Sequence, residues 1–110
     1  MKTHSDVLAH IKNCIVEKRY RIRNHAVRHM IEEGFDENHL VAALTGKMRV
    51  LEEYEDEERY LVLGHFRFTL STRSSLHVVC DLSYPEIVDI VTAYIPQRPW
   101  WISPTQRART

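Results

Sequence analysis

The chain has 110 residues; 44% of them are hydrophobic, 27% are charged, and the formal net charge is zero. This length suits one domain whose core forms without disulfide bonds or a bound metal. A zero net charge argues against a dedicated duplex-DNA binder, and without a run of about 18 apolar residues the sequence predicts no membrane span.

The charges cancel in total but are unevenly distributed. Residues 1–30 have an excess of basic residues, and residues 31–60 have an excess of acidic ones. The N-terminal segment lacks the apolar stretch of a secretory signal, and no spacing pattern pairs Cys14 with Cys80. We therefore expect a cytosolic protein with two reduced core thiols, organised as a single domain over residues 1–110.

Three helices are predicted in the first 46 residues. Apolar residues recur at helical spacing before residue 18, and an extended segment at 20–23, which can form a short edge strand, precedes two further helical stretches. The predicted N-caps are Ser5, Asn24 and Asp36, and the helices are expected to end near Lys18, at Gly34 and at Gly46.

After Gly46 the apolar period changes from 3.6 to 2, which predicts four strands. Each connection between them is short enough for a hairpin. The strands are predicted at 48–54, 60–70, 76–82 and 87–95, with turns at 55–58, 72–75 and 83–86. The predicted fold class is therefore α+β, with two to three N-terminal helices followed by a four-stranded antiparallel meander. The tail from residue 96, with two adjacent tryptophans, is expected to lie over the domain or on a second subunit.

The start of the second helix is rich in basic side chains. On a helical projection, His25, Arg28, His29 and Glu32 fall opposite an apolar stripe. That stripe consists of Ala26, Val27, Met30 and Ile31. A short helix does not need such a polar set in order to fold, so the segment indicates a site.

The same segment resembles a known family. The run Tyr-Arg-Ile-Arg, then Asn-His25-Ala-x-Arg28-His-Met and Glu-Glu-Gly-Phe-Asp, is similar to the family catalogued as domain of unknown function 4258. The similarity extends through Leu-His77-Val-Val and Ile-Val-Thr-Ala-Tyr94-Ile-Pro to Trp100, covering about residues 18–101 and leaving 102–110 as a tail. His29 stands where the family usually has Arg, and a basic residue usual in the family is replaced by Glu33.

This resemblance implies a small helix-plus-sheet fold, similar in layout to the toxin ribonucleases of bacterial toxin–antitoxin modules. It names no agreed activity, and a shared layout alone does not establish one. RNA and a protein partner such as an antitoxin are the partners it suggests. The sequence does not predict an oligomeric state.

Metal-independent RNA cleavage needs a base for the ribose 2′-hydroxyl, an acid for the leaving oxygen and cations for the phosphate. His25, at a helix N-terminus, is expected to be a neutral base there, and arginines bind phosphate bidentately. The predicted catalytic residues are His25, Arg28 and His77, and the predicted substrate-binding residues are Arg23, His29 and Tyr94. The reaction requires no cofactor and no metal. His77 can act as the acid only if its sheet face reaches the start of the helix.

Each of these residues also has a structural interpretation. His25 can fix the start of the helix through a backbone hydrogen bond, and Arg28 can form an ordinary ion pair with Glu32 on the helix surface. His77, on a half-polar strand face, can be solvated or hydrogen-bonded. The aromatic residues Tyr94, Trp100 and Trp101 can serve as packing anchors.

Two other functional hypotheses remain open. His25 and His29, at positions i and i+4, could bind one metal ion with Glu32, Glu33 or His77 as the third ligand. Alternatively, the chain could be a non-catalytic binding or regulatory module. In that case the acidic turn at 55–58 and the aromatic tail would form its docking surface.

Overall fold

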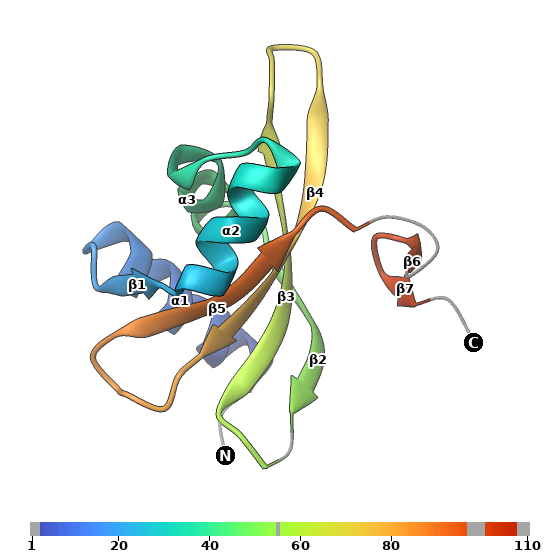
Figure 1. The fold of residues 1–110 in the computed structure, drawn as a ribbon. Helices are drawn as coiled ribbons and strands as arrows, with labels where there is room; N and C mark the ends of the chain where they lie inside the picture. The colour runs from blue at the N-terminus through green and yellow to red at the C-terminus, as the bar shows by residue number, and fades with distance from the viewer. Residues whose placement is uncertain (1–2, 55, 97–100, 108–110) are drawn as a thin grey trace.

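The computed structural model describes residues 3–54, 56–96 and 101–107. Three helices precede the sheet, as the sequence predicts, and the α+β class is confirmed (Figure 1). The helices are α1 (His4–Val16), α2 (Asn24–Glu33) and α3 (Glu37–Thr45). The strands are β1 (Tyr20–Ile22), β2 (Arg49–Tyr54), β3 (Arg59–Arg67), β4 (Arg73–Asp81), β5 (Val88–Tyr94), β6 (Trp101–Ser103) and β7 (Gln106–Arg107). Among the residues named in the predictions, Glu55, Trp100 and the side chain of Trp101 lie outside the described part of the chain.

Two of the predicted N-caps are wrong. Thr3, not Ser5, caps α1, because Thr3 and Asp6 form a reciprocal capping box that satisfies two backbone N–H groups. Arg23, not Asn24, is the N-cap of α2, and its side chain makes no capping hydrogen bond. The backbone N–H of Arg23 still donates to Ile90 in the sheet, so the helix begins immediately after the last β1 contact.

The remaining helix boundaries follow the sequence. Gly34 ends α2 with φ 78°, a left-handed conformation that glycine adopts without strain. Asp36 caps α3 by accepting a hydrogen bond from the His39 N–H, and Gly46 follows its last turn. The apolar stripe of α2 is only half buried: Ala26 and Met30 face the core, whereas Val27 and Ile31 are exposed.

The sheet has five strands in the order β1-β5-β4-β3-β2. Strands β2 to β5 form the predicted antiparallel meander, and β1 adds a parallel edge strand by pairing Tyr20 with Val88 and Ile22 with Ile90. The sheet is therefore mixed rather than wholly antiparallel.

The predicted position of the second hairpin turn, at 72–75, is wrong. Arg73 to Ser75 pair with β3, and the turn lies at residues 68–72. The Thr69 hydroxyl accepts hydrogen bonds from the N–H groups of Ser71 and Thr72, which closes this turn. Serine and threonine side chains suit both strands and turns, so the run 69–75 did not mark the boundary.

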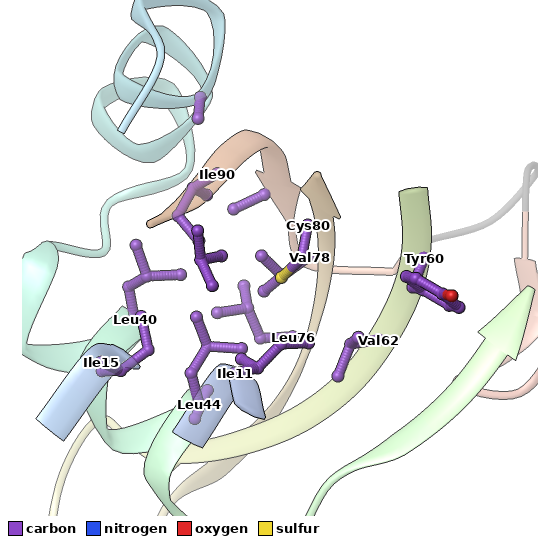
Figure 2. Close-up of a cluster of buried hydrophobic side chains, with 14 of the residues drawn as sticks. Ile11, Ile15, Leu40, Leu44, Tyr60, Val62, Leu76, Val78, Cys80 and Ile90 are labelled. Carbon is purple, nitrogen blue, oxygen red and sulfur yellow. The ribbon is translucent and has the colours of Figure 1, made fainter. Parts of the chain in front are cut away.

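The helices cover one face of the sheet and build the main core with it (Figure 2). Its fully buried members come from all three helices and three strands; they include Ile11, Leu40, Leu44, Val62, Leu76 and Ile90. On the other face, which we call the helix-free face, Leu61 and Val79 form a smaller apolar cluster. The β6–β7 hairpin lies on that side of the sheet (Figure 1).

Candidate functional site

A buried histidine on the helix-free face lies between a tyrosine hydroxyl and a backbone carbonyl. The His77 side chain is fully buried; its Nε2 is 2.5 Å from the carbonyl oxygen of Pro104, and its Nδ1 is 3.3 Å from the Tyr94 hydroxyl. A carbonyl oxygen only accepts hydrogen bonds, so Nε2 carries a hydrogen and donates it. In the neutral ring Nδ1 is then an acceptor for the Tyr94 O–H. We call Tyr94, His77 and the Pro104 carbonyl the relay.

A β-bulge in β5 positions the relay. Val79 of β4 pairs with Thr92 of β5, and the next residue, Cys80, pairs with Ile90. Val91 is therefore the extra residue of the bulge. Side chains alternate between the faces of a strand, and Asp89 and Tyr94, five residues apart, would otherwise lie on opposite faces. The bulge places both on the helix-free face, with Tyr94 directly opposite His77.

The helix-free face is cationic between the relay and the β3–β4 turn. Arg49 on β2 pairs with Leu63, which in turn pairs with His77. The next two pairs on this face are His65 with Ser75 and Arg67 with Arg73. None of the described residues paired in these rows is acidic. This half of the face therefore presents basic groups to an anion.

At the opposite end of the same face, basic side chains are paired with buried carboxylates. Asp89, whose side chain is 1% exposed, accepts two hydrogen bonds from Arg21, at 2.6 and 2.9 Å, and one from Arg23 at 3.0 Å. These bonds, the Arg21 bond first, outweigh the effect of burial and lower the pKa of Asp89. The carboxylate is thus ionised and fully engaged, and it ties β1 to β5.

Asp81 and Arg59 form a second pair in the neighbouring strands, with Nε and Oδ2 2.7 Å apart. Burial acts to raise the pKa of Asp81, but hydrogen bonds from Arg59 and Ser83 together lower it. Asp81 lies opposite Asp89 in the β4–β5 register, so each of two adjacent carboxylates has its own arginine. These ion pairs have a structural explanation, because they tie β1 to β5 and β3 to β4.

The predicted site residues of α2 form a separate group, which we call the α2 group: His25, Arg28 and His29. The rings of His25 and His29 meet edge to face with centroids 4.7 Å apart, and His29 Nδ1 lies 3.5 Å from Glu33. Glu33 also accepts a hydrogen bond from the backbone N–H of Ile95. His25 and Arg28 are exposed.

The α2 group and the relay lie on opposite faces of the sheet. Helix α2 packs through Ala26 and Met30 on the core face, whereas His77 points to the helix-free face. Of the six predicted site residues, the structure pairs His77 with Tyr94 and stacks His25 against His29. Arg23 donates a hydrogen bond to Asp89 instead.

The described residues offer no group of three or more His, Cys, Asp or Glu that could hold a metal ion. Cys14 and Cys80 are buried free thiols, and burial raises the pKa of Cys80 to about 12. A thiol with such a pKa is protonated near neutral pH and is a poor nucleophile or metal ligand. None of the helices in the described ranges is long and apolar enough to cross a membrane.

Comparison with protein-family models decides the family. The model described as domain of unknown function (DUF4258) matches residues 22–95, well over half of the chain. The chain belongs to the DUF4258 family. The matched segment of this DUF4258 chain runs from the end of β1 through β5, so it contains α2, His77 and Tyr94, whereas Pro104 lies beyond it. Searches of the curated proteins and of the solved structures gave no match.

Sequence reasoning missed several residues of this DUF4258 domain. Asp89 is not among the site residues predicted from the sequence, although a carboxylate between Val88 and Ile90 in an apolar strand signals a buried ion pair. Its partner Arg21 is predicted only as part of the extended segment. Pro104 was placed in the tail, and no local signal in the sequence connects its carbonyl with His77.

Proposed function

We propose that this DUF4258 domain cleaves RNA without a metal or cofactor, at the relay on the helix-free face. The observation that carries the proposal is the Tyr94–His77–Pro104 arrangement, in which a hydroxyl, an imidazole base and a fixed acceptor follow one another. The cationic rows beside it supply sites for phosphate. A molecule with zero net charge and one local basic region suits a limited contact with RNA rather than general affinity for nucleic acid.

The reaction follows from the hydrogen-bond directions. The Tyr94 oxygen takes the proton of the ribose 2′-hydroxyl while the Tyr94 O–H proton passes to His77 Nδ1. The freed 2′-oxygen pair forms a bond to phosphorus, and the bond from phosphorus to the 5′-oxygen breaks. The leaving oxygen keeps the electron pair of that bond and receives the proton back through Tyr94. The products are a 2′,3′-cyclic phosphate and a 5′-hydroxyl.

The three relay members have different tasks in this scheme. Tyr94, which is half buried, touches the substrate, whereas His77 is fully buried and exchanges protons with the substrate through Tyr94. The Pro104 carbonyl keeps the Nε2 hydrogen in place and stabilises the imidazolium when it forms. Arg49 and His65 hold phosphates on either side of the cleaved bond.

The experiment compares Tyr94→Phe with Tyr84→Phe, a matched change at an exposed tyrosine in the β4–β5 turn. In single-turnover cleavage of a short RNA we expect Tyr94→Phe to slow the reaction by about 100-fold or more. Tyr84→Phe should leave it unchanged, and a 2′-deoxy substrate should resist cleavage. Wild-type rates for Tyr94→Phe, or no cleavage by a folded wild-type protein, would refute the proposal.

The α2 group is the second candidate location for the same reaction. The first turn of α2 has no side-chain N-cap bond and no acidic residue, so its N–H groups and the exposed His25 and Arg28 are available to a phosphate. Here His25 would be the base, with Arg23 and Arg28 as phosphate ligands. A loss of cleavage in His25→Ala together with normal cleavage by Tyr94→Phe would move the reaction to α2.

The remaining expectations about this protein are proposals of the same kind. Buried free thiols fit a reducing compartment, so we propose a cytoplasmic location. We also propose that an antitoxin-like protein partner controls the activity by covering the helix-free face. If a folded protein binds such a partner and cleaves no RNA, the domain is a binding module instead.

A further inference from the structure

The β3–β4 hairpin projects beyond the helices at one end of the molecule (Figure 1). The 22 residues from Arg59 to Cys80 include three arginines, two histidines and no acidic residue. At the turn, Phe68 is 41% exposed and Leu70 is 94% exposed. Large apolar side chains in such positions, where the only charged residues nearby in the sequence are basic, suggest a contact with an anionic partner.

Two arginines face each other at the base of this turn. Arg67 and Arg73 are the last register pair of β3 and β4, and like charges directly opposite each other destabilise a hairpin. Within the described ranges, neither arginine forms an ion pair with a carboxylate. Arg67 Nη1 donates to the carbonyl oxygen of Leu70 at 3.0 Å, which holds its guanidinium at the turn. A bound phosphate would offset the repulsion between the two charges.

Aromatic rings on the helix side of the hairpin border a groove that this pair also lines. Phe68 packs edge to face on Phe66, with centroids 4.7 Å apart, and on His39 of α3 at 5.4 Å. The Phe68 ring is therefore held in place while part of it stays exposed. An adjacent groove of about 530 Å³ is lined by His39, Phe66 and both arginines, and none of the described residues lining it is acidic.

We propose that the tip of this hairpin, from Arg67 to Arg73, binds single-stranded RNA. A base would stack on Phe68, and a phosphate would be held between Arg67 and Arg73. Exposed bases and phosphates alternate along a single strand, which matches an aromatic ring beside paired guanidinium groups. A duplex hides the faces of its bases, and an acidic peptide supplies charge without flat rings.

Arg73 of the tip and His77 of the relay lie on the same strand and the same face of the sheet. Arg73 and His77 are four residues apart on β4 and share the helix-free face, which corresponds to about 13 Å along the strand. An RNA strand held at the tip can therefore continue to Tyr94. The inference rests on the proposed function only in taking RNA as the natural ligand, since binding at the tip requires no cleavage.

The test measures fluorescence anisotropy of a labelled single-stranded 2′-deoxy oligonucleotide, which cannot be cleaved because it lacks the 2′-hydroxyl. Phe68→Ala should weaken binding about tenfold. Arg67→Ala and Arg73→Ala should each weaken it and reduce the slope of log affinity against log salt by about 0.7. The controls Lys12→Ala and Tyr84→Ala remove an exposed charge and an exposed ring elsewhere and should bind as the wild type.

Several outcomes would overturn the inference. Unchanged binding by Phe68→Ala and both arginine variants would do so, as would equal affinity for a duplex of the same sequence. Competition by a polyglutamate peptide as strong as by single-stranded RNA would identify an acidic protein partner instead. If RNA cleavage depends on Tyr94 but is indifferent to all three tip variants, the proposed function stands and the tip inference fails. If the tip binds but no RNA is cleaved, the reverse holds.

Discussion

Asp89 carries a charge in a place that almost no water reaches, and its three hydrogen bonds to Arg21 and Arg23 compensate for the lost hydration. Asp89→Asn keeps the shape of the side chain but removes the charge that both arginines contact. Because hydrogen bonds to charged groups contribute about 1.5–3 kcal/mol each and the arginines are half exposed, we expect a loss of about 2 kcal/mol in the free energy of unfolding at pH 7.

The same substitution predicts a pH dependence. The pKa of Asp89 is lowered in the folded state, chiefly by Arg21, so the carboxylate stabilises the fold above its unfolded pKa of about 3.9. That contribution is lost as the pH falls from about 4 through the lower folded-state pKa. In urea unfolding at pH 7, 5 and 3, the difference between the wild type and Asp89→Asn should therefore shrink only at pH 3. Glu86→Gln, at an exposed site, is the control, and a difference independent of pH would contradict this account.

His77 shows what a single residue's sequence context can and cannot reveal. Its alternation with Leu76 and Val78 correctly places it on the opposite sheet face from the core, and the sequence correctly places Tyr94 near the end of the strand that becomes β5. Their pairing depends on the extra residue Val91, and a one-residue bulge leaves no distinctive composition behind. The Pro104 contact spans 27 residues and has no local signal at all.

At the scale of elements, the packing of α3 on β3 depends on a single glycine. A Cβ at Gly64 would lie 2.6 Å from the backbone oxygen of Ala43 and 3.0 Å from its Cβ, which is closer than packed atoms allow. The obstacle is helix backbone and cannot move without shifting α3. We expect Gly64→Ala to lower the free energy of unfolding by about 1–3 kcal/mol, measured by urea titration.

The matched control for this change is Gly46→Ala. A Cβ there would lie 3.4 Å from the Ala42 oxygen, an ordinary contact, and the residue has a negative φ that alanine adopts. It should therefore unfold within about 0.5 kcal/mol of the wild type. Equal destabilisation by both substitutions would show that the close approach of α3 to β3 is not the cause.

The ends of an element could be predicted where neighbouring residues in the sequence determine them. The pairing of an element with a distant segment could not. The ends of α2 and α3 follow from Gly34, Asp36 and Gly46, each of which acts on its own neighbours. Strand β1 is only three residues long and becomes a strand through β5, which lies 68 residues further along the chain. The extended conformation of residues 20–23 was therefore predictable, but its parallel pairing was not.

On the scale of the whole molecule, zero net charge conceals a separation of charge along the sheet. Six of the seven residues at 52–58, at the β2–β3 end, are acidic, whereas the stretch 59–80 has no acidic residue. These two hairpins share β3, so their turns lie at opposite ends of that strand (Figure 1). A polyanion is repelled at one end and attracted at the other, which orients it on the helix-free face.

The tail allows the fold and the proposed reaction to be separated. Among the residues whose burial the structure describes, the fully buried core members run from Val7 to Ala93, and a chain ending at Pro96 keeps these. We expect that chain to retain its far-UV circular dichroism and a cooperative urea transition. It lacks the Pro104 carbonyl, so the neutral His77 ring is free to carry its hydrogen on Nδ1, where it cannot accept the Tyr94 proton.

Cleavage of RNA by the shortened chain should therefore fall about tenfold or more, while its binding of the single-stranded 2′-deoxy oligonucleotide, which the β3–β4 tip provides, should stay the same. The truncation also removes Arg98, Arg107 and Arg109, so the matched control is the full chain with alanine at those three positions. If that control loses as much cleavage as the truncation, the tail acts through its charges. If the truncated chain cleaves at the wild-type rate, the Pro104 carbonyl does not orient His77. If the truncated chain fails to fold, the tail is part of the folded core.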